Sequence, residues 1–307
     1  MAYRFQPGEP LDREIARIAG EEIAIAVKSL GERGRARAEG IHEARKSIKK
    51  IRALLRLVET HLGEAYSNEQ AALRDIGRRL SEVRDRHVVV ETLDRLRKKY
   101  SRKLRATDVA NLRRALVAER ISAEKQSGLT RTLPEIRSSL ETIAQRIGEW
   151  HSRVKGLALI EDGLENTFRR GRKALAKARR HPSDQAYHQL RKRVKDYWYE
   201  VRLLEDFWTR SWKQREASLR DLEDSLGNDH NLVVLREAIL KSARANRHPS
   251  AVRSVLKAMD AYRRKLRKSS LTVARHVYDE TPKDVRKRAE RLCQRKQRDH
   301  RNDRNQA

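Results

Sequence analysis

The chain has 307 residues, with 72 Lys and Arg against 43 Asp and Glu, a formal net charge of +29. A charge of this size favours polyanionic partners and speeds their capture, but it does not specify a fold. The single cysteine, Cys293, excludes an internal disulfide and a cysteine-based metal site. Because no apolar run could span a bilayer and the N-terminus lacks a signal core, we expect a cytoplasmic protein.

The composition predicts an all-α protein. Only 13 Gly and 6 Pro are available for turns, and long stretches consist of the strong helix formers Ala, Leu, Arg, Lys and Glu. In the first half, breaks at Gly and Pro delimit helices over about 11–30, 40–62, 68–99, 108–126 and 134–155.

The second half restarts the same succession. Helices are expected over about 155–180, 185–208, 211–226, 230–246 and 250–280, with Gly227 interrupting the third and fourth. The segment His181-Pro182-Ser183-Asp184 has the residues of a turn and helix cap. Two antiparallel, four-helix-type bundles are therefore predicted, at about 8–154 and 155–282, followed by a basic tail over 283–307 that either extends a helix or is disordered.

One pattern occurs twice, about 146 residues apart. His42 is followed by cations at +3, +4, +7 and +14, and His188 is followed by cations at the same four spacings. At 100° per residue these positions share one side of a helix. The stripe of the first helix contains His42, Arg45, Lys46, Lys49, Arg52 and Arg56, and that of the second contains His188, Arg191, Lys192, Lys195 and Arg202.

The opposite side of each helix is apolar and should be buried, with Ile48 and Ile51 in the first and Leu190 and Val194 in the second. Like charges at i, i+4 destabilise a helix, so stripes with almost no acid indicate an anionic partner. Tyr199 lies at the angle of the second stripe and could donate its hydroxyl to the same ligand. A histidine beside phosphate has its charged form favoured, which predicts tighter binding below neutral pH.

A second repeated element supports an internal duplication. The segment Arg84-Asp85-Arg86-His87 matches Asn228-Asp229-His230-Asn231 at an offset of 144. Asp85 lies at helical spacing from Arg74 and Arg78, so we expect an ion pair that orients them. Asp229 is expected to act in the same way, or to cap the helix resuming after Gly227.

With these motifs, and with HQLRKRVKDYWYEVRLLE from His188 to Glu205, the chain resembles the CHAD domain, the conserved histidine α-helical domain, over about residues 8–282. The resemblance implies two bundles related by a pseudo-two-fold axis and a basic groove or pore that binds inorganic polyphosphate. Its ligand-facing residues would be His42, Arg45, Lys49, Arg52, Arg56, His188, Arg191, Lys195 and Arg202, with Lys46 and Lys192 next. No Glu-x-Glu-x-Lys strand of a CYTH domain occurs.

Two other functions remain open at this point. A sequence-nonspecific nucleic-acid-binding protein would use the same charge, although aromatic residues for stacking make up only 5% of the chain, and Trp150, Trp198, Trp208 and Trp212 sit among apolar neighbours expected in the core. An enzyme acting on phosphate chains would need carboxylates for Mg²⁺ that no motif supplies. We therefore predict a non-catalytic polyphosphate-binding protein without metal or cofactor, with polyphosphate granules as one possible location; the sequence leaves its oligomeric state open.

Overall fold

A computed structural model describes residues 3–126, 128–150, 156, 158–207, 210–242 and 247–291, without the side chains of residues 35, 82–87 and 123–126. The regular structure of these residues is helical throughout, which confirms the all-α prediction. None of the described helices is long and apolar enough to cross a membrane. The elements are α1 (Leu11–Leu30), η1 (Gly34–Ala36), α2 (Arg37–Leu57), α3 (Glu59–Leu62), α4 (Glu64–Arg79), α5 (Ser81–Lys99), α6 (Ala106–Gln126), α7 (Leu129–Gly148), α8 (Ala158–Arg180), α9 (Asp184–Leu203), η2 (Glu205–Phe207), α10 (Arg210–Lys241) and α11 (Pro249–Val277), with a last helical segment over 282–291.

Local signals set several of the boundaries. α1 begins directly after Pro10, as predicted. At the start of α9 the Ser183 side chain accepts a hydrogen bond from the backbone N–H of Ala186 at 3.1 Å, which confirms the predicted cap. The single helix predicted over 68–99 is divided into two helices, since α4 ends at Arg79 and a separate helix, α5, begins at Ser81.

Two predicted breaks are wrong. α10 continues through Gly227, because one glycine costs a helix only about 1 kcal/mol relative to alanine and α10 packs on both α9 and α11. α7 begins at Leu129, so Pro134 lies inside this helix rather than before it. The neighbours Leu133 and Ile136 are buried, and their packing offsets the backbone hydrogen bond that proline cannot make.

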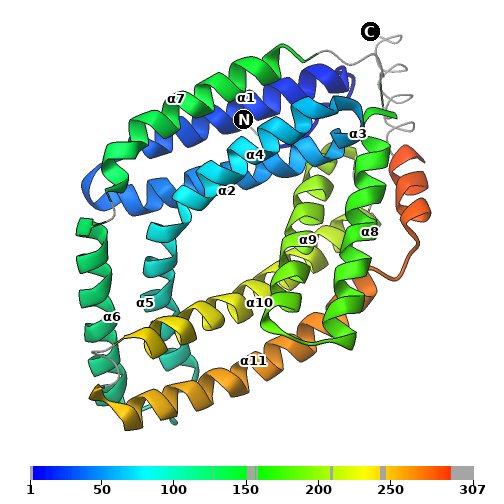
Figure 1. Ribbon diagram of the computed structural model, residues 1–307. Helices are drawn as coiled ribbons and strands as arrows, with labels where there is room; N and C mark the ends of the chain where they lie inside the picture. The colour runs from blue at the N-terminus through cyan, green and yellow to red at the C-terminus, as the bar shows by residue number, and fades with distance from the viewer. Residues whose placement is uncertain are drawn as a thin grey trace.

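The helices form a ring with four sides (Figure 1). Its inner helices contact one another in a closed cycle, α2 on α9, α9 on α10, α10 on α5 and α5 on α2. An outer helix backs each of them, with α1 on α2, α8 on α9, α11 on α10 and α6 on α5, and α7 packs on α1. Residues from the two halves of the chain therefore meet where α2 contacts α9 and where α5 contacts α10.

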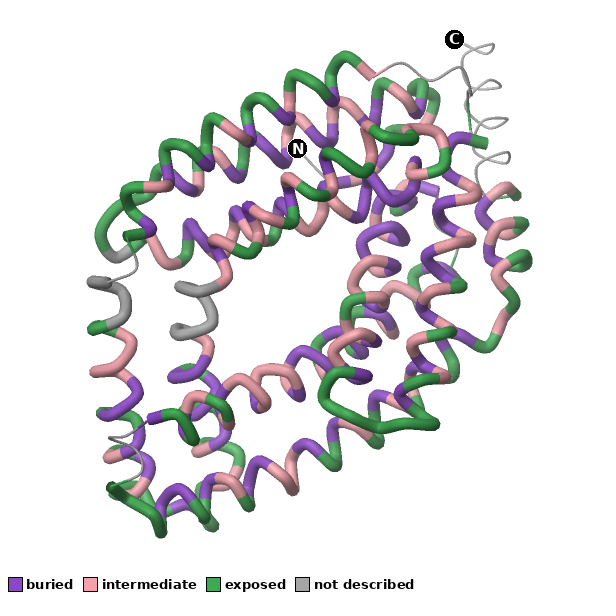
Figure 2. Tube along the Cα trace, viewed as in Figure 1, coloured by how far each residue is buried: buried purple, intermediate pink, exposed green. Residues whose placement is uncertain are grey.

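The buried side chains belong to two apolar cores, and Figure 2 shows the buried positions distributed around the whole ring. The larger core includes Ile18, Leu54, Phe168 and Trp212, from α1, α2, α8 and α10. The smaller core joins α5 and α6 to the second half of α10 and the first half of α11. Both cores draw on both halves of the sequence, and the duplicated two-bundle division near residue 154 stays a prediction.

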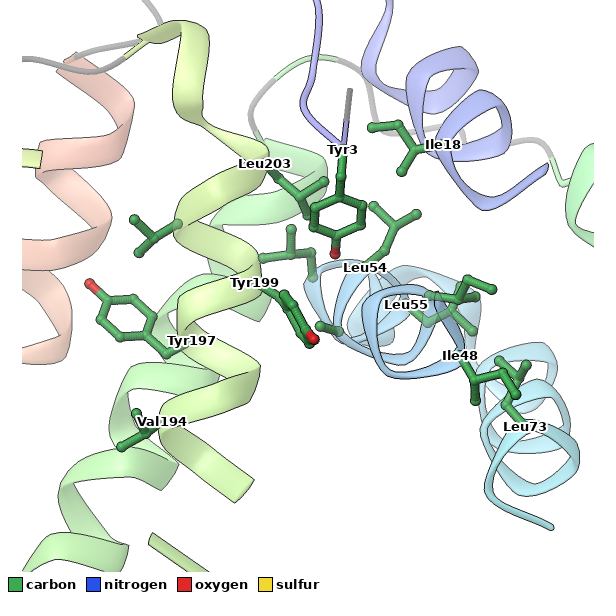
Figure 3. Close-up of a cluster of buried hydrophobic side chains, with 14 of the residues drawn as sticks. Tyr3, Ile18, Ile48, Leu54, Leu55, Leu73, Val194, Tyr197, Tyr199 and Leu203 are labelled. Atoms are coloured by element: carbon green, nitrogen blue, oxygen red, sulfur yellow. The ribbon is translucent and has the colours of Figure 1, made fainter. Parts of the chain in front are cut away.

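The contact between α2 and α9 is built on aromatic packing (Figure 3). Tyr199 of α9 lies against α2, and Tyr3 from the N-terminal segment packs edge-on against Tyr199 with ring centroids 6.0 Å apart. The Tyr3 hydroxyl donates a hydrogen bond to the backbone oxygen of Lys50 at 2.9 Å. This packing fixes the position of one histidine-headed helix relative to the other.

Candidate anion-binding site

The two histidine-headed helices, α2 and α9, lie in contact. Their predicted apolar sides are buried, since Ile48, Ile51, Leu190 and Val194 are at most 2% exposed. Burial of these sides leaves the cationic sides to face other polar groups. Arg191 and Lys195 of α9 both reach Glu223 on α10, so the stripe of α9 faces the third inner helix of the ring.

Three cations, Lys49, Arg191 and Lys195, interact with Glu223, and Arg45 lies close to Lys49. We call these five residues the inner cluster. Lys195 Nζ lies 2.9 Å from Glu223 Oε1, and Arg191 Nη2 lies 3.0 Å from the same oxygen. Burial, together with Lys195, Arg45 and Arg191, holds the pKa of Lys49 well below its usual value. The free protein therefore keeps a half-buried lysine among like charges, at an electrostatic cost.

Glu223 is the principal counterion of this cluster. Burial by itself would raise the pKa of Glu223, but Lys195 and Arg191 outweigh it and hold that pKa below the usual value. Burial also lowers the pKa of Lys195, against the attraction of Glu223. One carboxylate shared among several cations leaves the cluster with excess positive charge.

Two histidines border the inner cluster. The rings of His188 on α9 and His230 on α10 have centroids 4.5 Å apart. Burial and the nearby Arg191 lower the pKa of both, that of His230 to about 4. Both are neutral in the free protein at neutral pH, and a bound polyanion would favour their charged forms.

His42, at the head of the first stripe, lies among carboxylates. One ligand atom each from Glu39, His42 and Glu43 lies within 4.8 Å of the other two. Glu43 pairs with Lys46 at 2.8 Å and Glu39 is exposed, so ordinary surface interactions account for both carboxylates. The other residues of the first stripe continue along α2 toward α9.

A second group of cations surrounds Asp196 on α9, and we call Arg52, Arg56, Lys192, Arg193 and Asp196 the Asp196 cluster. Arg56 Nη1 lies 2.9 Å from Asp196 Oδ1, and Arg193 Nη1 lies 3.4 Å from Oδ2. Burial and the neighbouring Arg56 lower the pKa of Arg52 to about 10. Burial and Arg193 lower the pKa of Lys192. This cluster repeats the character of the inner cluster, several cations sharing one carboxylate.

Three further predicted residues belong to neither cluster, although Lys195 Nζ lies 5.6 Å from the ring centroid of Tyr199. Lys46 is exposed and pairs with Glu43. Tyr199 is only 3% exposed and belongs to the core, where burial raises its pKa far above the usual value. Arg202 lies over the ring of Trp198, 5.4 Å from its centroid. A ligand could reach the hydroxyl of Tyr199 only after the core had opened.

The secondary residues have separate roles. Arg74 is close enough to Arg52 to help lower its pKa, and Arg78 pairs with Asp75 on its own helix. The side chains of Arg84 and Asp85 lie outside the described residues. Asp229 accepts hydrogen bonds from Arg263 and Arg267 of α11, and it lies inside α10 rather than at a helix start.

The sequence did not reveal the counterions Glu223 and Asp196. Glu223 lies on another helix, beyond any spacing rule, and Asp196 flanks the stripe by one position. The prediction of core tryptophans holds for Trp212, which is buried, whereas Trp198 is half-buried and donates a hydrogen bond from Nε1 to Glu216. Trp150 is also partly buried, and Trp208 lies outside the described residues.

The arrangement is suited to holding an anion with several charges in a row. Guanidinium groups make bidentate hydrogen bonds to phosphate oxygens, and ammonium groups act as adaptable point charges. Arg191 and Lys195 of α9 lie close enough to Lys49 of α2 to lower its pKa, as does Arg45 on α2 itself. A linear anion could therefore contact both helices at once.

Comparison with known proteins gives a family and a fold. Residues 18–240 match the family model of the CHAD domain. The fold is similar to the crystal structure of the CHAD domain from the plant Ricinus communis, with a TM-score of 0.66 and 16% sequence identity over 91% of this chain and 95% of that one. At this identity the likeness shows the fold alone. No curated protein matches the chain.

Proposed function

The chain belongs to the CHAD-domain family, and we propose that it binds inorganic polyphosphate through the cations of α2 and α9. The observation that carries the proposal is the setting of Lys49. This lysine is held beside Arg45, Arg191 and Lys195, with Glu223 as the opposing charge. The repulsion among these cations costs free energy in the free protein. A bound polyanion would neutralise the repulsion, and the free energy released would favour binding.

The inner cluster and the Asp196 cluster together suit a chain of phosphates better than one phosphate. Lys49 and Arg52 are three residues apart on α2, so their Cα atoms differ by about 4.5 Å along the helix axis. They belong to the two clusters, which thus follow one another along α2. Polyphosphate has a charge on every unit and no bases to read, so closely spaced cations are sufficient to recognise it.

We assign the protein no catalytic role. The site offers cations and hydrogen-bond donors, and the carboxylates nearest to it, Glu223 and Asp196, are occupied by ion pairs with lysine or arginine. Binding would occur in the cytoplasm, with polyphosphate granules as the place where a polyphosphate-binding protein would accumulate.

A competition titration tests this function. Labelled long-chain polyphosphate would be bound to the protein at near-physiological salt and challenged with unlabelled polyphosphate, single-stranded RNA, orthophosphate and triphosphate. We expect unlabelled polyphosphate to displace the label at concentrations orders of magnitude below those of the other anions. Displacement by RNA at the same charge concentration would show a general polyanion surface and overturn the proposal.

A further inference from the structure

The outward face of α11 carries a third stripe of cations, which we call the α11 stripe. Arg253, Lys257, Arg264, Lys268 and Arg275 are all exposed, and their spacings of 4, 7, 4 and 7 place them within about 60° of one another around the helix. Arg275 lies 22 residues after Arg253, so the stripe extends over about 33 Å of helix. The buried residues of α11, such as Val255, Met259 and Leu266, lie on its opposite side.

Within the described part of the chain, none of these five cations has an ion-pair partner. The inward arginines of the same helix, Arg263 and Arg267, are paired with Asp184 and Asp229. Asp260, an acid within the span of the stripe, is paired with Arg236 of α10.

Some cations on other helices are paired with an acid of the same helix. Arg17 pairs with Glu21 on α1, and Arg169 pairs with Glu165 on α8. The α11 stripe instead places like charges at i, i+4 twice, an arrangement that destabilises a helix unless an anion covers it.

The stripe is separate from the site on α2 and α9. α11 is an outer helix of the ring and packs on α10, α6 and α8 (Figure 1). The inner cluster involves α2, α9 and the side of α10 that carries Glu223. A polyanion on the outward face of α11 would therefore leave the inner cluster accessible.

We infer that the α11 stripe binds the phosphate backbone of duplex nucleic acid. A rigid duplex presents preordered phosphates to a straight, exposed helix face and loses little conformational entropy on binding, whereas a flexible polyphosphate chain gains most from enclosure. The polar neighbour Ser254 is exposed beside the stripe and can donate a hydrogen bond to phosphate.

The other polyanionic partners fit this face less well. Single-stranded nucleic acid is held by stacked aromatic side chains, and the nearest aromatic residue of α11, Tyr262, packs against Tyr100 instead. A membrane surface is held by large apolar anchors as well as charge, and the exposed residues among the five cations are polar. With both surfaces occupied, one molecule would connect polyphosphate to duplex nucleic acid.

The test compares two triple variants of equal charge. One removes three stripe cations, Lys257→Gln, Arg264→Gln and Lys268→Gln. The control, Arg13→Gln, Lys28→Gln and Arg137→Gln, removes three exposed cations from α1 and α7, on the opposite side of the ring (Figure 1). Affinity for a short duplex DNA would be measured over a range of salt concentrations, with circular dichroism as the check on folding.

We expect the stripe variant to bind duplex DNA about 100-fold more weakly at near-physiological salt, and its log–log salt slope to be shallower by about 2.7, because each phosphate contact contributes about 0.9. The control should keep the wild-type slope, and both variants should keep the wild-type affinity for polyphosphate. Equal losses in the two variants would show that net charge alone attracts DNA. Binding of the wild-type protein to anionic vesicles but not to DNA would show that the partner is a membrane surface instead. Either result overturns the inference.

Discussion

Lowering the pH should destabilise the free protein through His230. Burial and the charges of Arg191 and Lys49 lower the pKa of His230 from 6.5 to about 4. The unfolded chain then binds this proton more tightly than the folded protein does. The contribution of neutral His230 to the free energy of unfolding is fully present above the unfolded-state pKa of 6.5 and is lost as the pH falls toward 4. From these two pKa values the loss between about pH 7 and pH 5 is about 2 kcal/mol, and it reaches about 3 kcal/mol below pH 4.

The variant His230→Gln isolates this contribution. It keeps a polar side chain of similar size but cannot become charged, so its free energy of unfolding should fall by about 2 kcal/mol less than that of the wild type over the same pH interval. Urea unfolding followed by circular dichroism at several pH values measures the difference. His188, whose pKa is lowered in the same direction, remains in the variant and leaves a residual pH dependence. If both proteins lose stability equally steeply, the account of His230 is wrong.

Bound polyphosphate should reverse the effect. A polyanion beside His230 and His188 favours their charged forms, so binding should take up protons near pH 6 and tighten as the pH falls. Calorimetry in buffers of different ionisation enthalpy measures the proton uptake, which should be smaller in His230→Gln.

Three further outcomes follow from buried positions. Lys49→Met should raise the free energy of unfolding, since it removes a half-buried lysine from like charges, and should weaken polyphosphate binding; a less stable variant would contradict the repulsion. Glu223→Gln should lower the free energy of unfolding by about 3 kcal/mol but tighten polyphosphate binding, because the competing carboxylate is lost; weaker binding would instead show that Glu223 positions the cations. Gly163→Ala should cost about 1–3 kcal/mol in urea unfolding, because its Cβ would lie 2.2 Å from the backbone oxygen of Leu57; unchanged stability would show that α2 and α8 can separate.

The stripes and their buried sides could be predicted because they depend on the spacing within one helix. Ile48, Ile51, Leu190 and Val194 are all buried as expected. Tyr199 shows the limit of this reasoning. Its angular position around α9 matches the stripe, but Tyr3 and α2 cover this part of the helix. The angular position of a residue does not show where along the helix axis a neighbouring element packs.

The counterions could not be predicted for a related reason. Glu223 reaches the inner cluster from α10, and only the tertiary fold brings it to Arg191 and Lys195. Gly227 was expected to end a helix, but contacts of α10 on both sides outweigh the small local cost of a glycine. In both cases packing between helices decides the outcome.

The central claim is that α2 and α9 together hold polyphosphate, and one measurement tests it most directly. Polyphosphate affinity would be compared between Arg45→Glu with Arg191→Glu and the control Arg13→Glu with Arg137→Glu, which has the same net charge. The neutral pair Arg45→Gln with Arg191→Gln would replace the first if repulsion from Glu223 unfolds it. We predict that the site pair loses polyphosphate binding while retaining its helicity, and that the control keeps wild-type affinity. Unchanged affinity in a folded site pair would contradict the assignment of polyphosphate to these helices.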